Sequence, residues 1–445
     1  MTCAGVARRR AAALATCLAG VVPAACSFAP HALGSVVPPS ASSRSGGAVR
    51  SVSSGKIQHV IFIIQENRSF DNLFQGYPGA DTASQGLDSS GHEIKLTPLS
   101  MTVPYDIDHS STAFFEAYDD GKMDGWNLEA NSAPPSKYPH PQYGYVPHAE
   151  SQLYFDMAGQ YVLGDRMYTS HIDASYVSHQ YAIAAQANSA VDFPTSAWGC
   201  YKKSDVITTL TAQRQYGPTI EVCQNYQTLG DELDAAKLTW RYYAYSKQSE
   251  WVAYRSIRHI FDGPDWSNVI GSSSRVLQDI QNGDLANVVW VTPTGTNSDH
   301  SGSLSASGPA WVASVVNAVG ESKYWNSSAI FVMWDEWGGW YDHVKPPYKD
   351  FDGLGFRVPL LIISPYAKNY VTHIQYEHGS VLRFIEDNWG LGQLAASDAR
   401  ASDPGNYEFN FAKPPRAFVP FKTKYSPEYF VRQEATEPQR DPDPY

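Results

Sequence analysis

The sequence predicts an α/β fold with a mainly parallel central sheet flanked by helices. Three observations lead to this prediction: continuous apolar runs, helical spacing between and after them, and a composition typical of an ordered chain. Charged residues make up 18% of the 445 residues and aromatic residues 13%, which excludes a largely disordered protein. A chain of this length can bury a large core.

Four short apolar runs are the predicted strands of this sheet. Each run is continuous rather than alternating, is rich in β-branched residues, and is bounded by Gly, Pro or polar residues. This is the pattern of parallel strands that are buried on both faces. The runs cover residues 59–64, 287–291, 329–334 and 358–364.

Two segments have the apolar spacing of helices. The first begins at Gly308-Pro309, and its valines recur on one helix face. The second begins at Ser380 with VLRFI and is expected to stop at Gly390. The valines of the first helix are Val312, Val315, Val316 and Val319.

The first 26 residues have the pattern of an export signal. Three arginines at positions 8–10 precede an apolar stretch that is too short to span a bilayer. Cys26 follows a small-residue run and is a candidate for lipid attachment, but Pro23 stands where lipoprotein signals usually carry Leu. We therefore expect a periplasmic or secreted protein without a lipid anchor and without a transmembrane helix in the mature chain.

The rest of the chain reads as a linker, one folded domain and a tail. Residues 27–55 have the Pro/Ser/Gly composition of a flexible linker, 56–425 show no internal repeat or second linker, and 426–445 form the tail. Residues 190–270 are dense in Trp, Tyr and Gly without clear periodicity, and are expected to form an irregular cap or insertion.

Cys200 and Cys223 are the two cysteines outside the export segment, out of five in the sequence. In an oxidising compartment we expect them to form a disulfide. The formal net charge of −12 argues against a general nucleic-acid binder, which needs a basic face.

Residues whose side chains can bind a metal ion follow two of the predicted strands. Glu66-Asn67 and Asp335-Glu336 come directly after buried runs, and Asp299-His300 follows a third run through a polar loop. Adjacent buried carboxylates repel unless a cation lies between them, and oxygen ligands suit Mg²⁺, Ca²⁺ or Mn²⁺. A solvated strand end accounts for these pairs equally well.

Ser175 stands at the predicted start of a helix. Backbone N–H groups and the positive end of the helix dipole favour negative oxygen there, so this hydroxyl is a candidate nucleophile beside a metal. On spacing alone, a plain helix cap is the favoured interpretation.

Several motifs in one order resemble the bacterial phosphoesterase family, which comprises phospholipases C and acid phosphatases of the AcpA type. The resemblance extends from about residue 56 to about 390. The motifs are ENRSFDNLF (66–74), GKMDGW (121–126), the Ser175 segment with HQY, SDH (298–300), WDEWGGWYDHV (334–344) and EHGSVLRFIE (377–386).

The resemblance implies that the folded domain is a catalytic domain with an alkaline-phosphatase-like fold. It also implies hydrolysis of phosphoric esters through a phosphoserine. It assigns Ser175 as the nucleophile, also bound to one divalent metal ion, and His109 and His300 as contacts of the phosphoryl group. Family members usually carry Gly-Pro before the nucleophile and Pro-Asn after it, which this chain lacks, so Ser178 is the alternative nucleophile. His343 and His378 occur in family motifs but receive no role. The remaining metal ligands are Glu66, Asn67, Asp335 and Glu336.

The function expected from the sequence is that of an exported, metal-dependent phosphoric ester hydrolase. Acid phosphatase-like action on small monoesters is favoured, because the chain ends soon after the catalytic region, and phospholipase C action on phospholipid head groups is the alternative. A sulfatase is disfavoured because the Cys/Ser-x-Pro-x-Arg motif is missing. A glycan-binding protein without catalysis is the alternative of another class, since 12 Trp and 28 Tyr could stack on sugars. No oligomeric state is predicted.

Overall fold

The computed structural model describes residues 52–436 except 197, 203 and 304. The predicted export signal, nearly all of the linker, and the end of the tail lie outside the described residues. Among the residues described, no helix is both long enough and apolar enough to cross a membrane.

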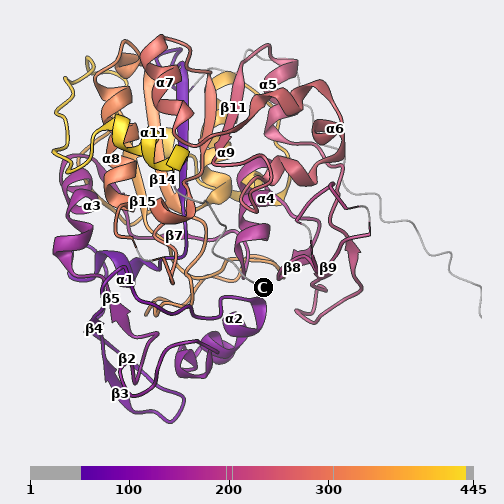
Figure 1. The fold of residues 1–445 in the computed structure, drawn as a ribbon, viewed down its shortest axis with the longest axis vertical. Coiled ribbons are helices and arrows are strands. Elements are labelled where there is room, and N and C mark those ends of the chain that lie inside the picture. Colours follow the sequence, from indigo (N-terminus) through magenta and orange to yellow (C-terminus); the bar gives the residue numbers. More distant parts are fainter. Residues whose placement is uncertain (1–51, 197, 203, 304, 437–445) are drawn as a thin grey trace, which may run out of the picture. The chain divides into compact units, whose positions relative to one another are not determined.

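A central eight-stranded sheet runs through the fold, with β1 and β14 in its middle (Figure 1). All four predicted runs are strands of this sheet. In spatial order the strands are β12 (Val269–Gly271), β11 (Trp240–Ala244), β13 (Val288–Val291), β1 (His59–Gln65), β14 (Ser328–Trp334), β15 (Leu360–Ile363), β6 (Val162–Gly164) and β16 (Tyr370–Thr372).

The sheet is mainly parallel, as predicted, but β15 runs antiparallel to both of its neighbours. Parallel direction was the wrong expectation for this run. A continuous apolar run reports burial on both faces and carries no information about strand direction. Residues 335–359, which join β14 to β15, contain no helix, so the chain turns back without the crossover that a parallel pair needs.

Two groups of helices cover the sheet. In the first group α3, α7 and α11 pack against α8, and in the second α4 and α10 pack against α9. Both predicted helices are present, with Pro309 in the first turn of α8 and Gly390 capping α9 in the left-handed conformation. The helices are α1 (Phe70–Phe74), α2 (Ser111–Tyr118), α3 (His148–Gln160), α4 (Ser175–Ala184), α5 (Leu229–Ala235), α6 (Arg258–Phe261), α7 (Arg275–Asn282), α8 (Gly308–Gly320), α9 (His378–Trp389), α10 (Ala396–Arg400) and α11 (Pro427–Thr436).

Large aromatic side chains fix α4 and α9 to one face of the sheet. Trp290 of β13 donates a 2.9 Å hydrogen bond from Nε1 to the carbonyl oxygen of Ala182 in α4. Phe331 of β14 packs against Phe384 of α9 with ring centroids 5.1 Å apart. Nine tryptophans of the described residues are fully buried, so they are packing residues and do not form an exposed surface for stacking on sugars.

The predicted cap over residues 190–270 is divided in the structure. Its second part supplies β11 and β12 to the central sheet. Its first part forms a separate three-stranded sheet, and the predicted disulfide between Cys200 and Cys223 is present in it. We call residues 190–223 the bridged segment. Its strands are β8 (Ala190–Val191), β9 (Val206–Thr209) and β10 (Ile220–Glu221).

Short two-stranded pairs complete the fold. Their strands lie in the connections between the larger elements. They are β2 (Gln85–Leu87) with β3 (Glu93–Lys95), β4 (Thr97–Pro98) with β5 (Gly144–Tyr145), and β7 (Met167–Tyr168) with β17 (Tyr376–Glu377).

Candidate active site

The carboxyl ends of β1 and β14 bring two of the predicted ligand pairs together. The strands are parallel neighbours, with Gln65 paired to Trp334, so Glu66 and Asp335 are the next residues on each strand. The Asn67 N–H donates a 2.9 Å hydrogen bond to Asp335 Oδ1. Both acidic side chains are fully buried. Parallel pairing is thus the local cause of their proximity.

Asn67 and the Gly-Gly pair after Glu336 shape the loops at these strand ends. Gly338 has a φ of +64°, and a Cβ there would lie 2.4 Å from the carbonyl oxygen of Asn67. Only glycine fits this close crossing of two chains. The carboxylate of Glu336 accepts a 2.7 Å hydrogen bond from the Gly338 N–H.

Ser175 is the first residue of α4, where the sequence places the start of a helix. Its side chain is fully buried, and its hydroxyl has no hydrogen-bond partner among the residues described. The hydroxyl of Ser178, the alternative nucleophile, instead donates a 2.5 Å hydrogen bond to the carbonyl oxygen of Asp335. This bond fixes the first turn of α4 against the end of β14.

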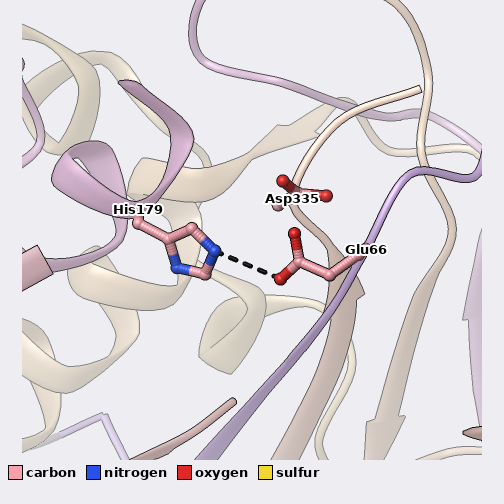
Figure 2. Close-up of side chains that lie close together, drawn as sticks. All are labelled: Glu66, His179 and Asp335. Atoms are coloured by element: carbon pink, nitrogen blue, oxygen red, sulfur yellow. Dashed lines mark hydrogen bonds and ion pairs between the residues drawn. The ribbon is translucent and has the colours of Figure 1, made fainter. Parts of the chain in front are cut away.

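His179 is a buried site residue that the sequence analysis missed. Its Nε2 lies 3.2 Å from Glu66 Oε1, and Figure 2 shows its ring directed from α4 toward Glu66 beside Asp335. These three residues each offer a ligand atom within 4.8 Å of the others. The available signal was the four-residue spacing from Ser175, which puts both side chains on one helix face. The structure does not bring the Glu336 carboxylate into this group of three.

Three oxygen atoms of the predicted ligands are buried without a hydrogen-bond partner in the part of the chain that the structure describes. They are Ser175 Oγ, Asn67 Oδ1 and Asp335 Oδ2. Leaving a buried acceptor unpaired costs about 1–3 kcal/mol, and more for a charged group. A cation coordinated by these oxygens would remove that cost, so the residues fit the metal ion that the family motifs imply.

His109 and His300 lie next to each other, with ring centroids 5.8 Å apart. Each ring places Nδ1 at a backbone carbonyl oxygen, 2.8 Å from that of Ile107 for His109 and 2.6 Å from that of Ser301 for His300. His109 Nε2 lies 3.2 Å from the Asn67 amide nitrogen, which directs Asn67 Oδ1 elsewhere. The carbonyl contacts favour a proton on Nδ1, which leaves Nε2 for proton transfer.

Asp299, the residue before His300, is held inside the core by hydrogen bonds. It accepts hydrogen bonds from Tyr154 Oη at 2.6 Å and Trp334 Nε1 at 3.2 Å. Burial raises the pKa of Asp299 to about 6, although these hydrogen bonds oppose the shift. Arg68 donates a 2.7 Å hydrogen bond to the Asp299 carbonyl oxygen and so connects this loop to the Asn67 loop.

His378 and His343, which received no role from the sequence, occupy different environments. His378 begins α9 and is fully buried, and this burial lowers its pKa to about 3. His343 lies 2.6 Å from Asp71 Oδ2 and 3.0 Å from Asp81 Oδ1. Asp71 and Asp342 flank the buried Arg357. His343 therefore belongs to an ion-pair network rather than to the group around Glu66.

Comparisons with known proteins identify the family of the chain. The model of the phosphoesterase family matches residues 57–392. Phospholipase C B of Mycobacterium tuberculosis is 24% identical over 436 residues, which cover 82% of this chain and 80% of the relative. Non-specific phospholipase C1 of Arabidopsis thaliana is 23% identical, with coverage of 83% and 74%.

Two further proteins are similar over most of the chain. Non-hemolytic phospholipase C of Pseudomonas aeruginosa is 24% identical, and the match covers 80% of this chain and 58% of the relative. A crystal structure of an alkaline phosphatase superfamily protein from Vibrio parahaemolyticus aligns with a TM-score of 0.41 at 10% identity, covering 78% of this chain and 69% of that one.

Proposed function

The chain belongs to the phosphoesterase family, and we propose that it is an exported, metal-dependent hydrolase that cleaves small phosphomonoesters through a phosphoserine at Ser175. One observation carries the proposal. The Ser175 hydroxyl is buried at the N-terminus of α4 without a hydrogen-bond partner in the described part of the chain, on the helix face that also directs His179 to Glu66 and Asp335.

The chemistry follows from the positions of these side chains. Ser175 Oγ attacks phosphorus and forms an O–P bond while the bond to the leaving alkoxide breaks. Backbone N–H groups at the start of α4 favour the negative charge that develops on the phosphoryl oxygens. Nε2 of His109 or His300 takes the Ser175 proton during the attack and passes it to the leaving alkoxide. Water, deprotonated by the same nitrogen, then attacks phosphorus, the serine O–P bond breaks, and the serine oxygen regains the proton.

A divalent cation held by Glu66, Asn67, Asp335 and Ser175 would polarise a phosphoryl oxygen and lower the pKa of the serine hydroxyl. Glu336 is part of the proposed ligand set from the family motif. Its carboxylate is buried at the same strand end, bonded to the Gly338 N–H.

Enclosure of the site supports a small substrate. Ser175, Asn67 and His300 have no exposed surface, and His109 is 1% exposed. Phe193 of the bridged segment packs against the edge of His109, with ring centroids 5.8 Å apart. A bulky diacyl lipid would require this segment to move, whereas a small phosphate ester needs less space.

Phospholipase C activity is the second candidate, and the names of the curated relatives favour it. A substrate panel separates the two candidates, with p-nitrophenyl phosphate and phosphatidylcholine assayed with and without chelator. Chelator-sensitive turnover of the monoester, lost in Ser175→Ala, supports the proposal. Turnover of phosphatidylcholine alone supports the second candidate, and no turnover of either ester contradicts both.

A further inference from the structure

His179 contacts an oxygen atom through each of its two ring nitrogens. Nε2 lies 3.2 Å from Glu66 Oε1, and Nδ1 lies 3.3 Å from the hydroxyl oxygen of Tyr242 in β11. The imidazole is 1% exposed, so contacts within the protein fix its protonation and orientation. The question is which nitrogen carries the proton.

The hydrogen bonds of the Tyr242 hydroxyl indicate that His179 carries its proton on Nδ1. This phenol donates its one proton to the carbonyl oxygen of Trp251. The Tyr242 oxygen is then an acceptor toward His179, and Nδ1–H is the donor.

In this neutral tautomer the lone pair of Nε2 is directed at the Glu66 carboxylate. Two electron-pair donors at 3.2 Å repel each other unless a proton or a metal ion lies between them. A second proton on His179 would form an ion pair with Glu66. It would leave Asp335 Oδ2, Asn67 Oδ1 and Ser175 Oγ without any partner among the residues described.

One metal ion accounts for all of these atoms together. We propose that His179 Nε2 is a ligand of the metal ion held by Glu66 and Asp335, and that Tyr242 is the positioning residue that keeps this nitrogen free of its proton. The proposal rests on the metal site of the proposed function and adds a ligand to which the family resemblance assigns no role. A hydrogen bond to the remote ring nitrogen is how metal-binding histidines are commonly oriented.

The nitrogen ligand changes the class of metal expected. Oxygen ligands alone predict a hard cation such as Mg²⁺ or Ca²⁺. Imidazole suits zinc and other first-row transition ions, which also accept carboxylate oxygens. We therefore expect the resident ion to be of the Zn²⁺ class.

Metal binding to the full exported chain tests this directly. Chelator-treated protein is titrated with Zn²⁺ and with Mg²⁺ for the wild type, His179→Gln and Tyr242→Phe. We expect His179→Gln to weaken Zn²⁺ binding by about 100-fold or more and Mg²⁺ binding by less than about 10-fold, and Tyr242→Phe to weaken Zn²⁺ binding by about 10- to 100-fold. His59→Gln removes a histidine bonded to the carbonyl oxygen of Ala286 at the opposite end of β1 and is the matched control.

A spectroscopic readout identifies the ligand itself. Co²⁺-loaded wild-type protein should show a paramagnetically shifted, exchangeable proton signal from His179 Nδ1–H in the NMR spectrum. The signal should be absent in His179→Gln and present in Ser175→Ala and His59→Gln. Should His179→Gln fail to fold, Tyr242→Phe still tests the proposal through its Zn²⁺ affinity and the position of this signal.

The outcomes separate this inference from the proposed function. Unchanged Zn²⁺ affinity in His179→Gln, or an exchangeable signal that persists in it, overturns the inference while chelator-sensitive ester hydrolysis upholds the function. If the signal is lost in His179→Gln but the wild type hydrolyses no phosphate ester, His179 is upheld as a ligand and the proposed function is overturned. A wild type that binds neither Zn²⁺ nor Co²⁺ overturns the inference outright.

Discussion

The Ser178 hydroxyl donates a 2.5 Å hydrogen bond to the backbone carbonyl oxygen of Asp335. This bond joins the first turn of α4, which carries Ser175, to the end of β14, which carries a predicted metal ligand. The proposed nucleophile and the proposed ligand group are therefore held by two elements that are hydrogen-bonded directly to each other.

Ser178→Ala should slow turnover while leaving the attacking hydroxyl of Ser175 in the protein. Loss of the bond lets the start of α4 shift, and small displacements of reacting groups reduce rates by about 10- to 100-fold. Ser175→Ala should reduce kcat by more than about 1000-fold, because it removes the attacking oxygen. Steady-state kinetics with p-nitrophenyl phosphate compare the two variants. If Ser178→Ala is inactive and Ser175→Ala is active, Ser178 is the nucleophile and the assignment of Ser175 is wrong.

Asp335→Asn should weaken metal binding strongly. The substitution keeps the shape of the side chain, including the acceptor for the Asn67 N–H, but removes one negative charge from the ligand group. Metal content after dialysis should fall below one ion per chain, and excess metal should restore part of the activity. Asp156→Asn, on the exposed side of α3, is the control. Full metal content in Asp335→Asn would argue against this ligand.

His343 should stabilise the fold below neutral pH. Burial alone lowers its pKa, but the hydrogen bond and charge of Asp71 outweigh burial, and the pKa of His343 is raised overall. Its stabilising contribution is therefore complete below the unfolded-state value of about 6.5 and is lost as pH rises through the folded-state value. The difference in Tm between the wild type and His343→Gln should be large near pH 6 and shrink toward pH 9.

The surface pair of His92 with Asp88 is the control for that experiment. The His92 side chain is 75% exposed, so His92→Gln should change Tm little at any pH. A gap for His343→Gln that grows with rising pH would contradict the assignment.

The disulfide should stabilise the bridged segment and, through Phe193, the surroundings of His109. Replacing Cys200 and Cys223, which are 23 residues apart, by Ser should lower the free energy of unfolding by about 3 kcal/mol. Chemical denaturation measures this loss. If the denaturant midpoint and the slope of the unfolding transition are unchanged, the disulfide contributes nothing to stability.

Phe193→Ala should widen access to the catalytic serine. Phe193 packs between His109 and Trp198, so its loss opens the wall over the histidines. Turnover of phosphatidylcholine should increase relative to p-nitrophenyl phosphate, and the KM for the monoester should rise. The ratio of kcat/KM for the two esters is the measurement, and an unchanged ratio would remove Phe193 from the substrate wall.

Strand ends were the most predictable part of this protein. A buried apolar run that stops at Glu66 or Asp335 identifies both the strand and the residue at its tip, because each feature depends on neighbours in the sequence. The direction of β15 was not predictable from its composition. It depends on residues 335–359, which reverse the chain without a helix.

His179 and Tyr242 show why the rest of the site required the structure. The ring of His179 contacts Glu66, 113 positions away in the sequence, and Tyr242, 63 positions away, and these contacts make it a candidate ligand. Only the packing of α4 against the sheet brings these residues together. The four-residue spacing from Ser175 places His179 on the same helix face as the serine, but it does not show that the ring contacts Glu66.

Trapping the covalent intermediate tests the central claim most directly. Protein mixed with a phosphomonoester is quenched in acid within its first turnover, digested, and mapped by mass spectrometry. The account predicts phosphate on the peptide that contains Ser175, located at Ser175 and absent from the Ser175→Ala variant. Phosphate on Ser178 or on a histidine, or full turnover without any phosphopeptide, would contradict it.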